Sequence, residues 1–215
     1  MNLKEYKSYL EDTPSYNTLQ EKNACIYLME NNDSIKVAKL LGLKPTNPLE
    51  AVAMIFQSRK KSVSEIIEVK STCVHCNSED FYFIDIDSLF FNKGIDESIP
   101  IKLIEEMDEI ETYLSKDINN MDISEFNKIE SIIINNNRNI FNNITNIKCK
   151  KCQKDFDIRI NYTDIISKFP IKNIYEQYLD LVQFTNMIKN DVDNMPPFER
   201  EIFIGLIQER ENKKE

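Results

Sequence analysis

Two pairs of cysteines constrain this chain more than any other feature of its sequence. Cys73 and Cys76 form one CxxC pair, and Cys149 and Cys152 form the other. Two intervening residues allow a tight turn in which both sulfur atoms point at the same ion. Because four thiolates make a closed tetrahedral site, the spacing predicts one structural zinc ion (Zn2+) per chain, bound by all four cysteines.

The residues around each pair have the pattern of β-strands. The segment EIIEVKST (65–72), which precedes the first pair, is rich in β-branched residues, and DFYFIDID (80–87) alternates after it. The segments NITNIK (143–148) and KDFDIRINY (154–162) flank the second pair in the same way. Alternation of this kind indicates half-buried strands. Each pair is therefore predicted at the tip of a β-hairpin, and two such hairpins sharing a metal form a zinc ribbon.

The distance between the two pairs is unusual for a ribbon. Simple ribbons place their pairs about 15–20 residues apart, whereas 72 residues (77–148) intervene here. The middle of this span has a helical pattern, which predicts a helical insertion at about 96–143. The alternative is that the pairs hold separate metals or are unmetallated thiols. Disulfides are not expected, because MNLKEYKSYLED (1–12) lacks the apolar segment of a signal peptide.

Composition excludes several kinds of site. With 3 Gly and 1 His among 215 residues, the chain has no phosphate-binding glycine loop and no multi-histidine metal centre. A zinc ion held by four thiolates leaves no open position for a substrate. We therefore expect no enzyme, no catalytic residues and no organic cofactor. The net charge of −9 argues against nucleic acid as the main partner, and no apolar run approaches a membrane span.

The single histidine, His75, and the fifth cysteine, Cys25, are interpreted as structural residues. His75, inside the first pair, could replace a cysteine as a metal ligand, but four thiolates already complete the site, so a solvated turn residue is expected. Cys25 lies in a helical pattern beside Leu28. It is predicted to be a small core residue without special reactivity.

Residues 1–62 are predicted to form an N-terminal helical region. Asp33 can cap a short helix that ends at Gly42, and Asn47 with Pro48 can start a longer one. An earlier helix carries a mostly apolar stripe (Tyr16, Leu19, Asn23, Cys25/Ile26 and Leu28/Met29). The basic run at 59–61 is interpreted as a solvated helix end, with phosphate or an acidic partner as the alternative.

The zinc ribbon and its insertion are predicted to occupy residues 63–162. Within 96–130, eleven acidic residues and three lysines give a local charge of −8. We expect one helix through Ile101 and Leu114, a second that starts at Asp122 with Ile129 and Ile133 inward, and a polar loop at 135–143. The carboxylates could form an acid–base pair or a divalent cation site, but a solvated acidic face is the preferred interpretation.

Residues 163–215 are predicted to form a C-terminal helical region. One wide apolar stripe, too apolar to be left in water, is formed by Ile174, Tyr175, Tyr178, Leu181, Val182 and Phe184/Thr185. Asn194 is expected to cap a last helix in which Phe198, Ile202, Phe203, Leu206 and Ile207 recur at helical spacing. The fold class is thus α+β and mostly helical, with a small antiparallel zinc-ribbon core between helical regions.

Three stretches resemble a known protein family. They are IFQSRKKSVSEII (55–67) with its Arg-x-x-Ser-Val segment, the CVHC knuckle with FYFIDID (81–87), and DNMPPFEREIFIGLIQER (193–210) with its Met-Pro-x-x-Glu-Arg run. Together with the order of helix, knuckle, insertion, second knuckle and closing helix, these stretches resemble the hub and hub-assembly proteins of T-even-type contractile-tail bacteriophage baseplates.

This resemblance implies a structural virion component or assembly factor without enzymatic activity. Its partners would be other baseplate and tail proteins, with a homo-oligomer as a further option. It would be assembled in the cytoplasm of a bacterial host and located in the tail baseplate. The competing hypothesis is a zinc-ribbon nucleic-acid-binding or transcription factor, because the second knuckle has a local charge of +3 over residues 148–159. An enzyme that uses the acidic insertion or Arg59 is a third hypothesis.

Overall fold

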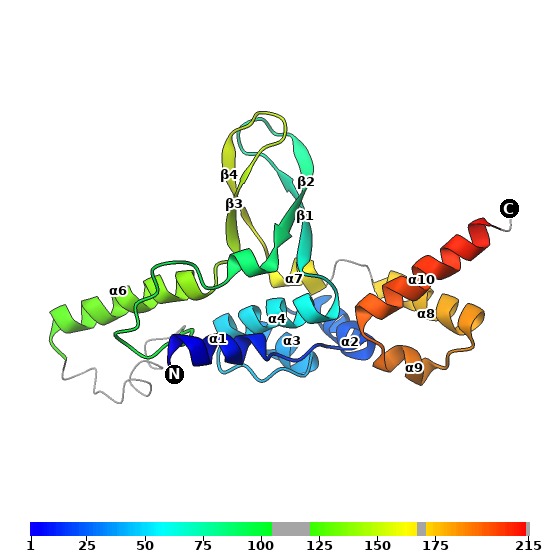
Figure 1. The fold of residues 1–215 in the computed structure, drawn as a ribbon, viewed down its shortest axis with the longest axis horizontal. Helices are drawn as coiled ribbons and strands as arrows, with labels where there is room; N and C mark the ends of the chain where they lie inside the picture. The colour runs from blue at the N-terminus through cyan, green and yellow to red at the C-terminus, as the bar shows by residue number, and fades with distance from the viewer. Residues whose placement is uncertain (105–120, 167–170, 214–215) are drawn as a thin grey trace.

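The computed structural model describes residues 1–104, 121–166 and 171–213, and it places a narrow β structure on a layer of helices (Figure 1). The predicted α+β class with mostly helix and two small antiparallel hairpins is confirmed. A short 3-10 helix, η1 (Ile86–Leu89), follows the first hairpin. The α-helices are α1 (Leu3–Glu11), α2 (Thr18–Leu28), α3 (Ser34–Leu40), α4 (Pro48–Ser62), α6 (Ile123–Ile140), α7 (Tyr162–Ile166), α8 (Ile171–Thr185), α9 (Lys189–Asn194) and α10 (Pro197–Asn212).

The strands form two separate antiparallel pairs. Strand β1 (Ile66–Thr72) pairs with β2 (Glu79–Asp85), and β3 (Ile144–Lys148) pairs with β4 (Asp155–Arg159). The hairpins stand side by side, and their tips meet at the end farthest from the helices (Figure 1). The predicted alternation is present, and the buried positions include Tyr82, Ile84, Phe156, Ile158 and Ile160.

Helix α4 lies at the base of the hairpins. Its start is as predicted, because the side chain of Asn47 accepts a hydrogen bond from the backbone of Glu50 and Pro48 occupies the first helical turn. Ile55 and Phe56 are completely buried. The ring of Phe56 packs edge-on against that of Phe141, with 5.2 Å between centroids. This contact joins α4 to the chain that leads into β3.

The interpretation of the basic run at the end of α4 as a solvated helix end was wrong for Arg59, whereas Lys61 is exposed. Arg59 is buried, and its guanidinium donates to the carbonyls of Ser64 and Ile66. Lys60 forms an ion pair with Asp87, at 2.6 Å. Lys61 donates to the carbonyls of Glu11, the last residue of α1, and of Thr13. These side chains satisfy carbonyl groups where the chain turns from α4 into β1.

The predicted polar loop at 135–143 was also wrong, because α6 continues to Ile140. Asparagine is a poor helix former, but side-chain amides on this helix bond to the backbone of residues 94–104. Asn136 is buried and exchanges two 2.8 Å hydrogen bonds with the backbone of Asp96. The side chain of Asn137 also exchanges two hydrogen bonds with the backbone of Ile104. These hydrogen bonds compensate for the low helix propensity of the asparagines.

The start of the insertion differs from the predicted helix. Residues 101–104 are not helical; Ile101 donates to the carbonyl of Met1 and Leu103 donates to the hydroxyl of Tyr6. The remainder of the predicted helix, residues 105–114, lies outside the described residues. The second predicted helix is confirmed as α6, with Asp122 as its N-cap and Ile129 and Ile133 buried.

At the C-terminal end, the predicted cap was wrong. Asn194 is the last residue of α9, and its side chain donates back to the carbonyl of Asn190. Helix α10 begins at Pro197 after Pro196, without a side-chain cap. Its buried face carries Arg200 and Ile204.

Apolar spacing also predicted the wrong buried residues on α2, α8 and α10. On α8, Tyr175, Val182 and Phe184 are exposed. On α10, Ile202 and Leu206 are exposed. On α2, Glu21 and Lys22 are buried, whereas Ile26 and Met29 are exposed. The buried faces are set by charge pairs: Arg200 with Glu21, and Lys22 with Asp193.

One cluster of buried apolar residues draws on all three predicted regions, 1–62, 63–162 and 163–215. Ile55, Ile84 and Leu181 are examples. The boundaries between these regions stay a prediction. Among the helices that the structure describes, none has both the length and the apolar character needed to cross a membrane.

Candidate metal centre

The four predicted cysteines come together at the tips of the two hairpins. Their sulfur atoms all lie within 4.8 Å of one another. Two contacts cross from one hairpin to the other, Cys73 to Cys152 and Cys76 to Cys149, each with 3.7 Å between sulfur atoms. Within residues 1–104, 121–166 and 171–213, this is the one group of three or more potential metal ligands.

The first turn is closed by backbone hydrogen bonds around Cys73. The N–H of Cys73 donates to the carbonyl of Ser78, at 2.9 Å, and the N–H of Asn77 donates to the carbonyl of Cys73, at 2.9 Å. Asn77 has a φ of 53°, in the left-handed region that asparagine tolerates better than most residues. This bend turns the chain back into β2 and keeps both thiols on the inner side.

The second turn repeats the same geometry. The N–H of Cys149 donates to the carbonyl of Lys154, at 2.9 Å, and the N–H of Gln153 donates to the carbonyl of Cys149, at 3.0 Å. Gln153 has a φ of 60°. Gln153 therefore takes the position that Asn77 has in the first turn. Two equivalent turns that face one another present four sulfur atoms to a common centre.

Hydrogen-bond donors surround the sulfur atoms. The hydroxyl of Ser78 lies 3.1 Å from the sulfur of Cys76 and 3.5 Å from that of Cys149. The backbone N–H of Cys152 also donates to Cys149, at 3.5 Å. This backbone bond and the Ser78 hydroxyl lower the pKa of Cys149 to about 5. Bonds from the same serine lower the pKa of Cys76.

Cys152 has the opposite shift. A backbone hydrogen bond at Lys154 lowers its pKa, but desolvation and the hydrogen bonds with Cys149, Cys76 and Cys73 outweigh that effect and raise the pKa to about 11. Thiolates so close together repel one another, which favours the protonated form of Cys152. A bound cation would remove this repulsion.

The separations between sulfur atoms fit a tetrahedral zinc ion. A Zn–S bond of about 2.3 Å in tetrahedral geometry puts neighbouring sulfurs about 3.8 Å apart. The two crossing contacts measure 3.7 Å. A disulfide would need about 2.05 Å, and all five cysteines are free thiols. The donor set and its spacing therefore suit a soft divalent metal.

Two side chains link the hairpins beside the cysteines. The Nε2 atom of His75 lies 2.9 Å from the carbonyl oxygen of Asp155. From the second turn to the first hairpin, Lys150 donates to the carboxylate of Asp80, at 2.9 Å, and to the carbonyl of Phe81, at 2.6 Å. Each turn therefore extends one side chain to the strand that follows the other turn. These links hold the turns in register.

Aromatic packing supports the cysteine cluster from below. The rings of Tyr82 and Phe156 meet edge to face, with 5.8 Å between centroids. The ammonium group of Lys150 lies over the Tyr82 ring, 5.4 Å from its centroid. Such a cation–π contact contributes about 0.5–1 kcal/mol at an exposed site. The pair fills the space between the two sheets.

His75 and Cys25 have the exposure and the burial that the sequence predicted for them. His75 is exposed and lies outside the group of four sulfurs. Cys25 is buried in the helical layer, where its thiol contacts the carbonyl of Ile166. Burial raises the pKa of Cys25 to about 12, so this thiol is not activated.

Comparison with family models, with curated proteins and with solved structures finds no match to this chain.

Sequence reasoning missed the contacts of Ser78 and Lys150. Lys150 contributed only to a count of basic residues, although it lies one residue after Cys149 and can reach the other turn. Ser78 lies in the turn that follows the first cysteine pair. The position of Ser78, two residues after Cys76, could have indicated this contact, because the turn brings that residue next to the sulfur atoms.

Proposed function

We propose that Cys73, Cys76, Cys149 and Cys152 bind one structural zinc ion and that the two hairpins form a zinc ribbon. The convergence of four sulfur atoms at tetrahedral spacing is the observation that supports this most strongly. Zinc suits a closed all-sulfur site and needs no redox change. The ion would join two hairpins that are otherwise separate two-stranded sheets. Isolated hairpins are at most marginally stable.

Metal analysis of protein purified without added chelator tests the zinc site. We expect one zinc per chain and a large fall in melting temperature after chelation, because structural zinc contributes about 10–16 kcal/mol in small peptides. Well under one metal per chain, together with an unchanged melting curve in chelator, would contradict the proposal. Iron in place of zinc would contradict the identity of the metal alone.

We further propose that the chain is a non-enzymatic structural or assembly protein of a contractile phage tail baseplate, in its hub region. The three stretches that resemble this family support the proposal. Large apolar side chains at the C-terminal end add to it, because Leu179 and Val182 of α8 and Ile202 of α10 are exposed. Leu179 and Val182 line one mostly apolar hollow, and exposed apolar patches are typical of protein interfaces. The partners would be neighbouring baseplate subunits.

Detection of the protein in phage tails tests this second part. Mass spectrometry of purified virions and of tail-assembly intermediates from infected cells should find the chain in at least one of them. In a pull-down with purified baseplate subunits, the Leu179→Asp and Ile202→Asp variants should bind less than the wild type. Absence of the protein from both virions and intermediates would reject the baseplate role, but it would not bear on the proposed zinc site.

A zinc-ribbon protein that binds nucleic acid remains a second candidate because of one observation. Phe81 of β2 is exposed, and its carbonyl accepts a hydrogen bond from Lys150 of the basic second knuckle. Exposed aromatic rings beside lysines can stack on bases of a single strand. Titration of labelled single-stranded DNA and RNA tests this candidate. Micromolar binding that weakens steeply with salt would favour it over the baseplate role.

A further inference from the structure

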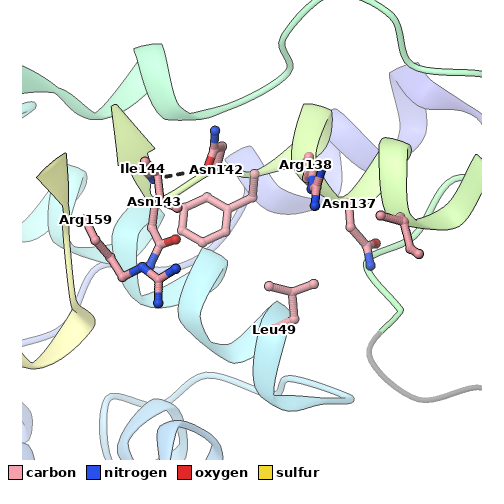
Figure 2. Close-up of a pocket in the computed structure, with 9 residues that line it drawn as sticks. Leu49, Asn137, Arg138, Asn142, Asn143, Ile144 and Arg159 are labelled. Carbon is pink, nitrogen blue, oxygen red and sulfur yellow. Dashed lines mark hydrogen bonds between the residues drawn. The ribbon is translucent and has the colours of Figure 1, made fainter. Parts of the chain in front are cut away.

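An open groove lies at the foot of the second hairpin (Figure 2). Its volume is about 580 Å³. Helix α6, the segment after it, the last residue of β4 and the first turn of α4 contribute to its lining. Its floor is apolar and consists of Leu49, Ile134, Phe141 and Ile144.

Two guanidinium groups line this groove and have no polar partner among the described residues. Arg138 belongs to α6 and Arg159 ends β4, and both are exposed. Arg59 and Arg200, in contrast, are buried and bound to oxygen atoms. Among the described residues that line the groove there are two cations and no carboxylate. This part of the lining is thus positive in a chain whose net charge is −9.

The amide side chains in the groove are already engaged. Asn137 bonds to the backbone of Ile104, and Asn143 donates to the carbonyl of Ile160, at 3.0 Å. The side-chain oxygen of Asn142 accepts from the N–H of Ile144, at 3.1 Å (dashed in Figure 2). The amides therefore shape the groove, and the guanidinium groups of Arg138 and Arg159 are its main donors for a ligand.

We propose that this groove binds an acidic peptide segment of a partner protein. Carboxylates of the segment would accept hydrogen bonds from Arg138 and Arg159, and an aliphatic side chain between them would rest on the apolar floor. The planar guanidinium group matches a carboxylate in geometry as well as in charge. This inference rests on the proposed function only in taking the partner to be a protein subunit.

A nucleic-acid ligand fits the groove less well. Binding of single strands depends on exposed aromatic rings that stack on the bases. Phe141, the one aromatic residue among those that line the groove, is buried. The other apolar residues of the floor are aliphatic. A peptide with carboxylates and aliphatic side chains uses both parts of the surface.

A titration followed by two-dimensional amide NMR on the zinc-loaded full-length protein tests the proposal. The probe is a capped pentapeptide of alternating leucine and glutamate. An otherwise identical peptide with glutamine in place of glutamate and a short thymidine oligonucleotide are the comparison ligands. The protein variants are Arg138→Gln and Arg159→Gln, with Arg210→Gln on α10 as the matched control. All three arginines are exposed, so the spectra should retain native dispersion.

The expected result is a saturable shift of amides in residues 137–144 and at Arg159 with the glutamate peptide. The affinity should fall about tenfold in Arg138→Gln and in Arg159→Gln, which corresponds to one charged hydrogen bond. Arg210→Gln should bind like the wild type. Equal binding of the glutamine peptide, no saturable shift, or tighter binding of the oligonucleotide at the same residues would each overturn the proposal. None of these results bears on whether the protein occurs in phage tails.

Discussion

Arg200 of α10 and Glu21 of α2 form an ion pair with 2.8 Å between Nη1 and Oε2, and their side chains are only 1% and 8% exposed. The same nitrogen donates to the hydroxyl of Thr18, at 3.2 Å. This contact joins the first and last parts of the chain. It also places Arg200, from the Met-Pro-x-x-Glu-Arg run, in the interior and not on a binding surface.

The Arg200→Leu variant should be strongly destabilised. Loss of the guanidinium leaves Glu21 buried without its counter-ion, which costs about 3–5 kcal/mol in the free energy of unfolding. The double variant Glu21→Leu with Arg200→Leu should recover most of that loss, because an apolar pair needs no desolvation of charge. Urea denaturation of the zinc-loaded protein measures both. A double variant less stable than Arg200→Leu alone would contradict this account.

The same pair predicts a dependence of stability on pH. Burial raises the pKa of Glu21 above its ordinary value of 4.5, and Arg200 opposes that shift. A carboxyl group with a raised pKa stabilises the fold below its unfolded pKa, and this contribution is lost as pH rises through the folded pKa. The urea midpoint of Arg200→Leu should therefore fall more steeply than that of the wild type between about pH 4 and pH 7. An equal dependence of the two urea midpoints on pH would reject the prediction.

Substitution of single cysteines should separate metal binding from core packing. Cys149→Ser removes one of the four proposed ligands, so the zinc content should drop below one per chain and the melting temperature should fall. Cys25→Ala should retain zinc, because Cys25 lies in the helical layer. Metal analysis and thermal denaturation measure both effects. Full zinc content in Cys149→Ser would remove this cysteine from the ligand set.

His75→Ala tests the contact between the two turns. The substitution removes the bond between Nε2 and the carbonyl of Asp155. We expect a loss of about 1 kcal/mol in stability, as for a typical hydrogen bond, with one zinc per chain retained. A lower zinc content with otherwise native spectra would instead make His75 a ligand.

Asn136→Ala should expose the role of the asparagines on α6. Its amide exchanges two hydrogen bonds with the backbone of Asp96 in a buried position, so the loss should be about 1–3 kcal/mol. Asn127→Ala, at an exposed position of the same helix, is the control. Both substitutions gain the same helix propensity, so the difference between their urea midpoints isolates the buried bonds. Equal midpoints would contradict the assignment.

The strands and the cysteine cluster were predictable because their signals are local. Alternation has a period of two residues, so the sequence around Tyr82 and Phe156 indicates both the strands and their inward faces. A CxxC spacing likewise restricts its turn. Two pairs that need a common tetrahedral centre then bring the hairpins together, whatever lies between them.

The errors arose where distant residues override local preference. The inward faces of α2 and α10 follow the pairing of Glu21 with Arg200, which apolar spacing cannot reveal. The helix at 135–140 forms because Asn136 and Asn137 bind backbone some 33–40 residues earlier in the chain. The partners of Arg59 are carbonyls that become available only when the chain turns into β1.

The separation of the two hairpins in the chain has a consequence for synthesis. The first turn leaves the ribosome 72 residues before the second pair begins. At about 5–20 residues per second, this gap lasts about 4–14 s. Throughout this interval Cys73 and Cys76 lack the other two sulfurs, so the nascent chain carries an incomplete, reactive pair of thiols. The insertion that contains α6 is made in that time, before the second turn can meet the first.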